Sequence, residues 1–168
     1  KLVSSEKKIE FQKIAQDYPV DEISNYQYRG LNIGMLALSS MIRYAKGAPI
    51  QGQDEIYRTY LYAALVDVEA AFNIIETYRP DRIYMSHGCY ADFGSALLVA
   101  QSLKIPTIVW GGAYLPQHQF MRTLPEKGTR NYQAPGQIAW ETRKNKALSE
   151  EENKRLDRYL QTRYSSKI

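Results

Sequence analysis

The chain has 168 residues, of which 44% are hydrophobic and 24% charged, and its net charge is +4 with a pI near 9.0. This mixture is that of an ordinary globular domain and argues against a disordered, collagen-like or coiled-coil protein. The single cysteine, Cys89, excludes an intramolecular disulfide and is typical of a reducing compartment. With only two histidines besides it, a four-ligand structural zinc site is also excluded.

The basic residues are spread along the chain without a block of like charge, which favours a mildly basic surface over nucleic-acid binding. No apolar stretch approaches the roughly 20 residues that a membrane-spanning helix needs. The sequence begins without Met and without a signal-peptide pattern. We therefore expect a cytoplasmic protein, and a fragment or excised domain of a longer chain.

Helical patterns dominate the first half. Apolar positions within residues 1–17 predict a short helix that Pro19 ends. The polar, tyrosine-rich residues 21–29 indicate a loop or short edge strand, and residues 30–34 are expected to open a second helix. The strongest helical pattern covers residues 53–78, where apolar side chains recur on one face. They are Ile56, Tyr60, Ala64, Val68, Ala71, Phe72 and Ile75.

A strand–helix–strand pattern follows. Residues 82–86 form a strand-like run, residues 91–103 a helix with Phe93, Ala96, Leu97 and Ala100 on its apolar stripe, and residues 107–110 a second strand. This is a βαβ unit with parallel strands and a right-handed crossover, so the fold class is α/β. The small residues 94–96 are expected to let the helix approach the sheet.

The remainder contains an irregular segment and a final helix. Residues 111–136 are polar and aromatic and are expected to form a long, irregular functional loop. A helix running to about Arg163 follows, with a capping box formed by Ser149 and Glu152.

The main candidate site is the turn Ser86-His87-Gly88 at the carboxyl end of the first βαβ strand, where ligands bind in open parallel sheets. His87 can act there as a general base. Gly88 admits a ligand close to the backbone, and the following helix N-terminus attracts phosphate or carboxylate. Alternatively, His87 only caps the strand end. Asp92 either orients His87 or stabilises the helix dipole.

The second candidate is the end of the next strand. Gly111 and Gly112 permit close approach of a ligand, Tyr114 and His118 follow at the same sheet edge, and Trp110 with Tyr114 can stack on a sugar ring. The alternative is a glycine-rich turn with buried aromatic rings. Residues 127–130 form a basic turn that either binds phosphate or is solvated. A metal site at His87, Cys89 and His118 is discounted for want of a carboxylate pattern.

Residues 80–88, Pro-Asp-Arg-Ile-Tyr-Met-Ser-His-Gly, together with Lys-Ile-Pro-Thr-Ile-Val-Trp at residues 104–110, resemble the N-terminal domain of GT-B glycosyltransferases. Within that group, the chain looks most like glycosyltransferases of bacterial capsular or surface polysaccharide biosynthesis. Residues 28–34 and 127–132 look like the same group. UDP-sugar 2-epimerases share the layout but carry an acid after the His-Gly pair, where this chain has Cys89 and Tyr90.

The resemblance implies a Rossmann-like, three-layer α/β/α domain with a short parallel sheet over residues 1–147, its core βαβ unit at residues 80–110. A helix at residues 148–168 would lead toward a second, missing domain that binds the nucleotide-sugar donor. This chain would hold a carbohydrate or lipid-linked saccharide acceptor near the inner membrane face, with His87 as base, and would be inactive alone. The resemblance implies no metal or cofactor. A non-catalytic module binding a sugar nucleotide or partner, and a UDP-sugar 2-epimerase, remain the alternatives.

Overall fold

The structure, a computed structural model, describes residues 2–46, 52–112, 119–124 and 137–165 of a mixed α/β protein. The chain divides into two compact units. The first comprises residues 1–111 and 120–132, and the second residues 112–119 and 133–168. The expected domain boundary after residue 147 stays a prediction.

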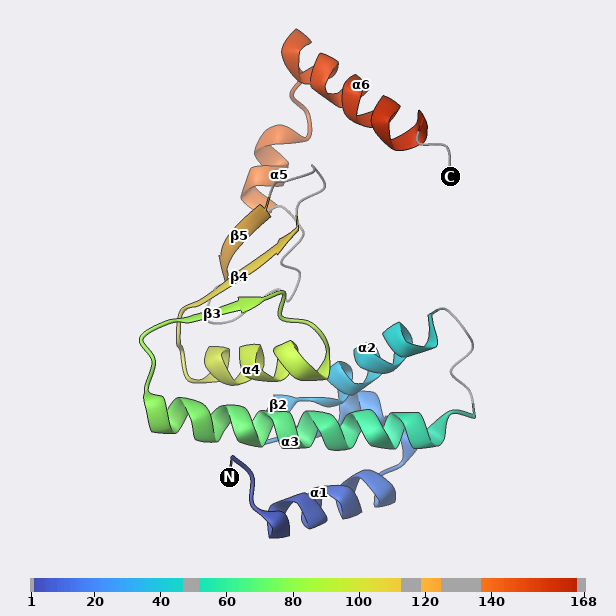
Figure 1. Cartoon of the computed structure of the whole chain (residues 1–168), viewed down its shortest axis with the longest axis vertical. Helices are drawn as coiled ribbons and strands as arrows, with labels where there is room; N and C mark the ends of the chain where they lie inside the picture. The colour runs from blue at the N-terminus through green and yellow to red at the C-terminus, as the bar shows by residue number, and fades with distance from the viewer. Residues whose placement is uncertain (1, 47–51, 113–118, 125–136, 166–168) are drawn as a thin grey trace. The chain divides into compact units, whose positions relative to one another are not determined.

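Helices form most of the first unit (Figure 1). The long central helix α3 contacts α1, α2 and α4, and α4 in turn contacts strand β3. The helices expected near the start of the chain, at residues 53–78 and at residues 91–103 are confirmed, each within a few residues. Their bounds are α1 Ser5–Asp17, α2 Gly34–Ala45, α3 Asp54–Tyr78 and α4 Tyr90–Ser102.

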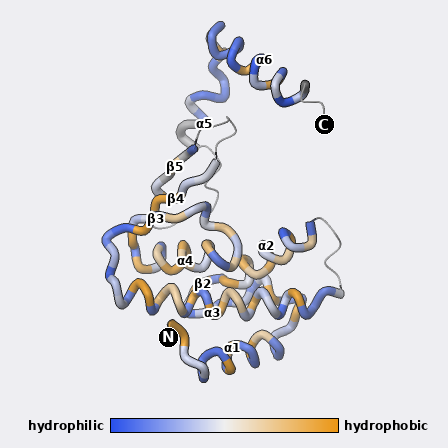
Figure 2. Tube along the Cα trace, in the orientation of Figure 1, coloured by the Kyte–Doolittle hydropathy of each residue, from blue (hydrophilic) through white to orange (hydrophobic). Residues whose placement is uncertain are grey.

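Helix α3 forms the middle of the hydrophobic core because one of its faces is apolar and buried from Leu61 to Ile75. Figure 2 shows hydrophobic residues recurring along α3 and α4. Phe11 of α1 and Val99 of α4 belong to the same buried cluster. The buried residues of α3 are Leu61, Ala64, Leu65, Val68, Ala71, Phe72 and Ile75, which confirms most of the predicted face.

The segment between α1 and α2 is more regular than expected. A 3₁₀ helix, η1 (Val20–Asn25), is followed by a small antiparallel hairpin of β1 (Gln27–Tyr28) and β2 (Leu31–Asn32). The turn residues Arg29 and Gly30 have φ of 50° and 77°, in the left-handed region that suits a tight hairpin turn. Helix α2 therefore begins only at Gly34, because the residues before it pair with β1.

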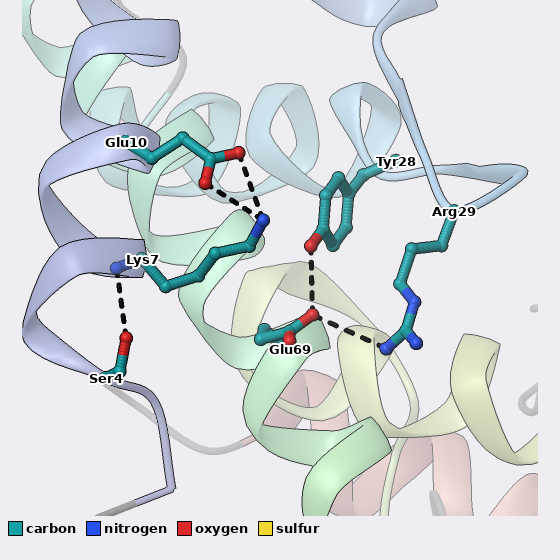
Figure 3. A network of polar contacts seen from close by, with 6 residues as sticks. All are labelled: Ser4, Lys7, Glu10, Tyr28, Arg29 and Glu69. Atoms are coloured by element: carbon teal, nitrogen blue, oxygen red, sulfur yellow. Dashed lines mark hydrogen bonds and ion pairs between the residues drawn. The ribbon is translucent and has the colours of Figure 1, made fainter.

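The hairpin is tied to α3 by side chains as well (Figure 3). The Tyr28 hydroxyl donates a hydrogen bond of 2.9 Å to Glu69, and Arg29 makes a 3.4 Å contact with the same carboxylate oxygen. The Arg29 guanidinium lies 4.1 Å from the centre of the Phe72 ring. In the same view, Lys7 of α1 pairs with Glu10 on its own helix.

The sheet of the first unit has the order β3-β4-β5. Strands β3 and β4 pair in parallel, with Ile83 opposite Thr107 and Ser86 opposite Trp110, which confirms the parallel pair of the βαβ unit. Two expectations were wrong. Strand β5 lies inside the segment expected to be irregular, and it makes the sheet mixed rather than purely parallel. The bounds are β3 Ile83–Ser86, β4 Thr107–Gly112 and β5 Gln119–Leu124.

Helix α4 lies between the sheet and the other helices. Leu97 packs in a small cluster with Met85 and Val109 of the sheet. Gly94 instead faces α2, since a Cβ there would stand 2.5 Å from the Leu36 side chain. The absence of a side chain at Gly94 therefore lets α4 approach α2, and not the sheet as expected. Phe93 was expected on the apolar stripe of this helix but is 38% exposed, because it lies at the wall of a cavity and not within the core.

In the second unit, the structure describes α5 (Gln137–Arg143) and α6 (Glu150–Ser165). The capping box is confirmed: the Ser149 N–H donates to Glu152 at 2.8 Å, and the Glu152 N–H donates to the Ser149 hydroxyl at 3.2 Å. Arg143 pairs with Glu152. Helix α5 has no counterpart among the sequence predictions. Within the described ranges, no helix is both long and apolar enough to cross a membrane.

Candidate functional site

A cavity of about 970 Å³ opens in the first unit between the end of α2, the first half of α3 and the start of α4. Its walls combine ionisable groups with aromatic rings. Those groups are Arg43, Tyr44 and Lys46 from α2 and its cap, Tyr60 and Asp67 from α3, His87 from the β3–α4 turn, and Tyr90, Asp92 and Phe93 from α4.

His87 enters this cavity directly from the end of β3. The backbone N–H of His87 donates a hydrogen bond of 3.0 Å to the backbone carbonyl of Trp110, which continues the parallel ladder by one residue. The backbone then turns sharply, with φ of 22° at His87, a positive value that is uncommon outside glycine. The half-buried ring meets Phe93 and Tyr90 edge to face, with centroids 4.6 and 5.9 Å away. Ring contacts and backbone together hold the imidazole at the cavity wall.

The other two residues of the predicted turn do not line the cavity. Ser86 is the last residue of β3 and is half-buried. Gly88 is buried, and a Cβ there would overlap the Leu97 side chain. The structure thus gives Gly88 a packing role, which is the close fit of the turn against α4.

At the N-terminus of α4, one backbone N–H group is already hydrogen-bonded to a side chain of the protein. The buried Ser40 hydroxyl of α2 accepts a 2.8 Å hydrogen bond from the Ala91 N–H. One of the N–H groups predicted to bind an anion therefore already has a partner. Tyr90 has φ of 65°, and the Arg43 guanidinium lies 4.5 Å from its ring centre, which joins α2 to α4 beside the cavity.

Asp67 is the functional candidate that the sequence analysis missed. It is half-buried in the α3 wall of the cavity. Burial, and secondly the negative charge of Asp92, raise the pKa of Asp67 from its ordinary value to about 6. A signal was present in the sequence: Asp67 lies three residues after Ala64 and four before Ala71, on the edge of the apolar face.

Asp92 projects from the first turn of α4 and is exposed. The sequence left open whether it orients His87 or stabilises the helix dipole. Its electrostatic effect on Asp67 adds a third role, because like charges near one another favour the protonated form of one of them.

Of the second predicted site, the structure describes Gly111 and Gly112, and neither lines the cavity. Gly111 and Gly112 continue β4 in extended conformation and do not form a turn, and a Cβ at Gly112 would meet no atom within 4 Å. Tyr114 and His118 lie outside the described residues, as does the basic segment at residues 127–130.

The arrangement suits a polar ligand that carries hydroxyl groups. Tyr44 and Tyr60 contact each other edge to face at 6.3 Å and offer ring surface, while cationic and carboxylate groups offer hydrogen bonds. A carboxylate with a pKa near 6 accepts a proton readily close to neutral pH. Within the described ranges, no three His, Cys, Asp or Glu side chains are grouped as they would be to hold a metal ion.

Comparisons of the chain with protein-family models, with curated proteins and with solved structures returned no significant match.

Proposed function

We propose that this chain is the acceptor-side part of a sugar transferase that uses a nucleotide-sugar donor, of the kind that builds capsular or surface polysaccharides. The observation that carries the proposal is the cavity that His87 enters from the end of a parallel strand. The β3–α4–β4 unit supports it and fits a Rossmann-like, three-layer GT-B N-terminal domain. The resemblance at residues 80–88 and 104–110 supports it independently of the geometry.

In such a reaction the cavity binds the acceptor, a carbohydrate or lipid-linked saccharide. A protein group takes the proton of the acceptor hydroxyl, the oxygen bonds to the anomeric carbon, and the nucleotide diphosphate leaves with its electron pair. A second domain would hold the donor. The expected cytoplasmic location, at the inner face of the membrane, belongs to the same proposal.

The test is transfer by the protein that contains this chain, with UDP-, GDP- and dTDP-sugars as donors and saccharide acceptors. Acceptor-dependent release of nucleotide diphosphate is the expected result. His87→Asn removes the imidazole, yet asparagine tolerates the positive φ at this position. Arg79→Asn is the matched control, because Arg79 also has positive φ but is exposed and lies outside the cavity.

Turnover should fall by about 10²-fold in His87→Asn if the imidazole takes the proton, and less, with a raised KM, if it only binds the acceptor. Unchanged kinetics would remove His87 from the site. Binding of a nucleotide sugar without release would favour a non-catalytic module. Inversion of the configuration at C2 of a UDP-sugar in the absence of acceptor would favour the epimerase. Either of these two results would overturn the proposal.

A further inference from the structure

Asp67 differs from Glu69, the other half-buried carboxylate of α3. Glu69, two residues later, receives hydrogen bonds from Tyr28 and Arg29. In the part of the chain that the structure describes, the half-buried Asp67 carboxylate makes no hydrogen bond or ion pair. A carboxylate withdrawn from water without a partner costs free energy. Such a group at a cavity wall is a candidate for contact with a ligand.

The surroundings of Asp67 leave room for that ligand. Ala63 stands one turn earlier on the same helix, lines the same cavity and has only a methyl group to fill it. Across the cavity, α2 and its cap contribute Arg43 and Lys46, and the β3–α4 turn contributes His87. A ligand hydroxyl in this space can therefore meet the carboxylate while cationic or imidazole groups hold its neighbours.

We propose that Asp67, rather than His87, accepts the proton of the acceptor hydroxyl, and that His87 positions that hydroxyl. This inference depends on the proposed function. In the step, the acceptor O–H bond breaks and its proton passes to the Asp67 carboxylate. The acceptor oxygen forms a bond to the anomeric carbon of the nucleotide sugar. The bond from that carbon to the diphosphate oxygen breaks, and the diphosphate leaves with the electron pair.

Asp92 acts on the reaction only through Asp67. The negative charge of Asp92 favours the protonated form of Asp67, so the Asp67 carboxylate holds the transferred proton more tightly than it would alone. Other ionisable groups line the same cavity: Arg43, Tyr44 and Lys46 on the α2 side, His87 in the turn, Tyr90 on α4, and Tyr60 on α3 itself. Because Asp67 works as a base only when deprotonated, kcat should rise with pH around pH 6.

The experiment compares Asp67→Asn and Asp92→Asn with the unaltered protein in the same transfer assay over pH 5–8. Asp67→Asn keeps the size of the side chain, and its kcat should be about 10²- to 10⁴-fold lower than that of the unaltered protein at pH 8, with little change in KM and without the acid limb. Asp92→Asn should keep most of its kcat but shift the acid limb to lower pH, since a negative charge beside Asp67 is gone.

The control is Glu76→Gln, which neutralises an exposed carboxylate of the same helix outside the cavity and should leave the pH profile unchanged. Thermal unfolding followed by circular dichroism shows that each variant is folded. Near-normal kcat in Asp67→Asn, or an acid limb that Asp92→Asn does not move, would overturn this inference and leave the proposed function standing. Absence of transfer by the unaltered protein from every nucleotide sugar would overturn both.

Discussion

At Gly34, the start of α2 passes so close to η1 that a Cβ would overlap the backbone carbonyl of Ile23. The Tyr26 carbonyl accepts hydrogen bonds from both Ile33 and Gly34, which holds the two segments together. A backbone neighbour cannot rotate aside as a side chain can. The absence of a side chain at this position therefore determines how η1 and α2 fit.

Gly34→Ala should lower the free energy of unfolding by about 3 kcal/mol, because the added methyl group forces the backbone apart. Gly112→Ala is the matched control: a Cβ there meets no atom within 4 Å, so we expect a change of no more than about 0.5 kcal/mol. Urea denaturation of both variants measures the difference. Equal stability of the two would contradict the close approach of η1 and α2.

The raised pKa of Asp67 also predicts how stability changes with pH. Its folded-state pKa of about 6 lies above its ordinary value, so the folded protein binds the proton more tightly than the unfolded chain. Asp67 therefore favours folding at about pH 4, and this contribution is lost as pH rises through about 6. Because the group is partly solvated, we expect a loss of only about 1 kcal/mol.

Asp67→Asn should remove that dependence and be more stable than the unaltered protein at pH 7.5 while differing little at pH 4.5. Urea denaturation at the two pH values, with Glu76→Gln as control, measures it. Asp67→Asn that is less stable at pH 7.5 would mean that the carboxylate makes a stabilising contact. A stabilised but inactive Asp67→Asn would be the pattern of a group kept for function at a cost in stability.

At the scale of single elements, α6 tests how far local sequence suffices. Its N-terminus is held by the reciprocal hydrogen bonds of Ser149 and Glu152, and Glu150 pairs with Lys154 one turn later. Figure 2 shows this helix as mainly hydrophilic, in contrast to α3. In the described structure, Leu156 and Leu160 are 41% and 37% exposed. Local interactions therefore contribute a larger share of the stability of α6 than of α3.

Ser149→Ala should lower the helicity of α6, because the cap hydrogen bond to the Glu152 N–H is worth about 1 kcal/mol. Thr162→Ala serves as control. The Thr162 hydroxyl bonds back to the Arg158 carbonyl, and this bond within the helix does not stabilise it. Carbon chemical shifts of the α6 backbone measure the helical population. If Thr162→Ala lowers the helical population of α6 as much as Ser149→Ala does, the loss of the cap is not the cause of the lower helicity.

For the whole molecule, the two units should differ in local stability. The first has a continuous core around α3 in which Leu61, Leu65 and Val68 are fully buried. The described part of the second unit consists of α5 and α6, whose described side chains are mostly exposed. Amide exchange tracks the free energy of local opening, which is largest where apolar burial is largest.

Hydrogen exchange followed by mass spectrometry should show α3 amides protected longest and α6 amides exchanging faster by on the order of 10²-fold or more. The amides of α4 provide an internal reference, since α4 packs on both α3 and β3. Protection of α6 equal to that of α3 would contradict this expectation and would mean that a surface covers its leucines.

Sequence alone determined the elements whose signals are local. Three features depend only on residues close together in the sequence, because hydrogen bonding and side-chain periodicity repeat over a few residues. They are the apolar face of α3, the capping box of α6 and the strand–helix–strand order around α4. The motif at residues 80–88 likewise placed His87 at the end of β3. Strand β5 was missed because a short strand depends on its partner more than on its own residues.

Only the tertiary structure decided the rest. The cavity exists because α2, α3 and α4 meet around it. The pKa of Asp67 is raised because segments distant in sequence bury it and bring the charge of Asp92 near it. At Gly88 and Gly94, a Cβ would meet the side chains of Leu97 and Leu36, which are brought there by the packing of α4. Desolvation, charge proximity and close packing depend on which segments become neighbours in space, and no periodicity along a single segment records that.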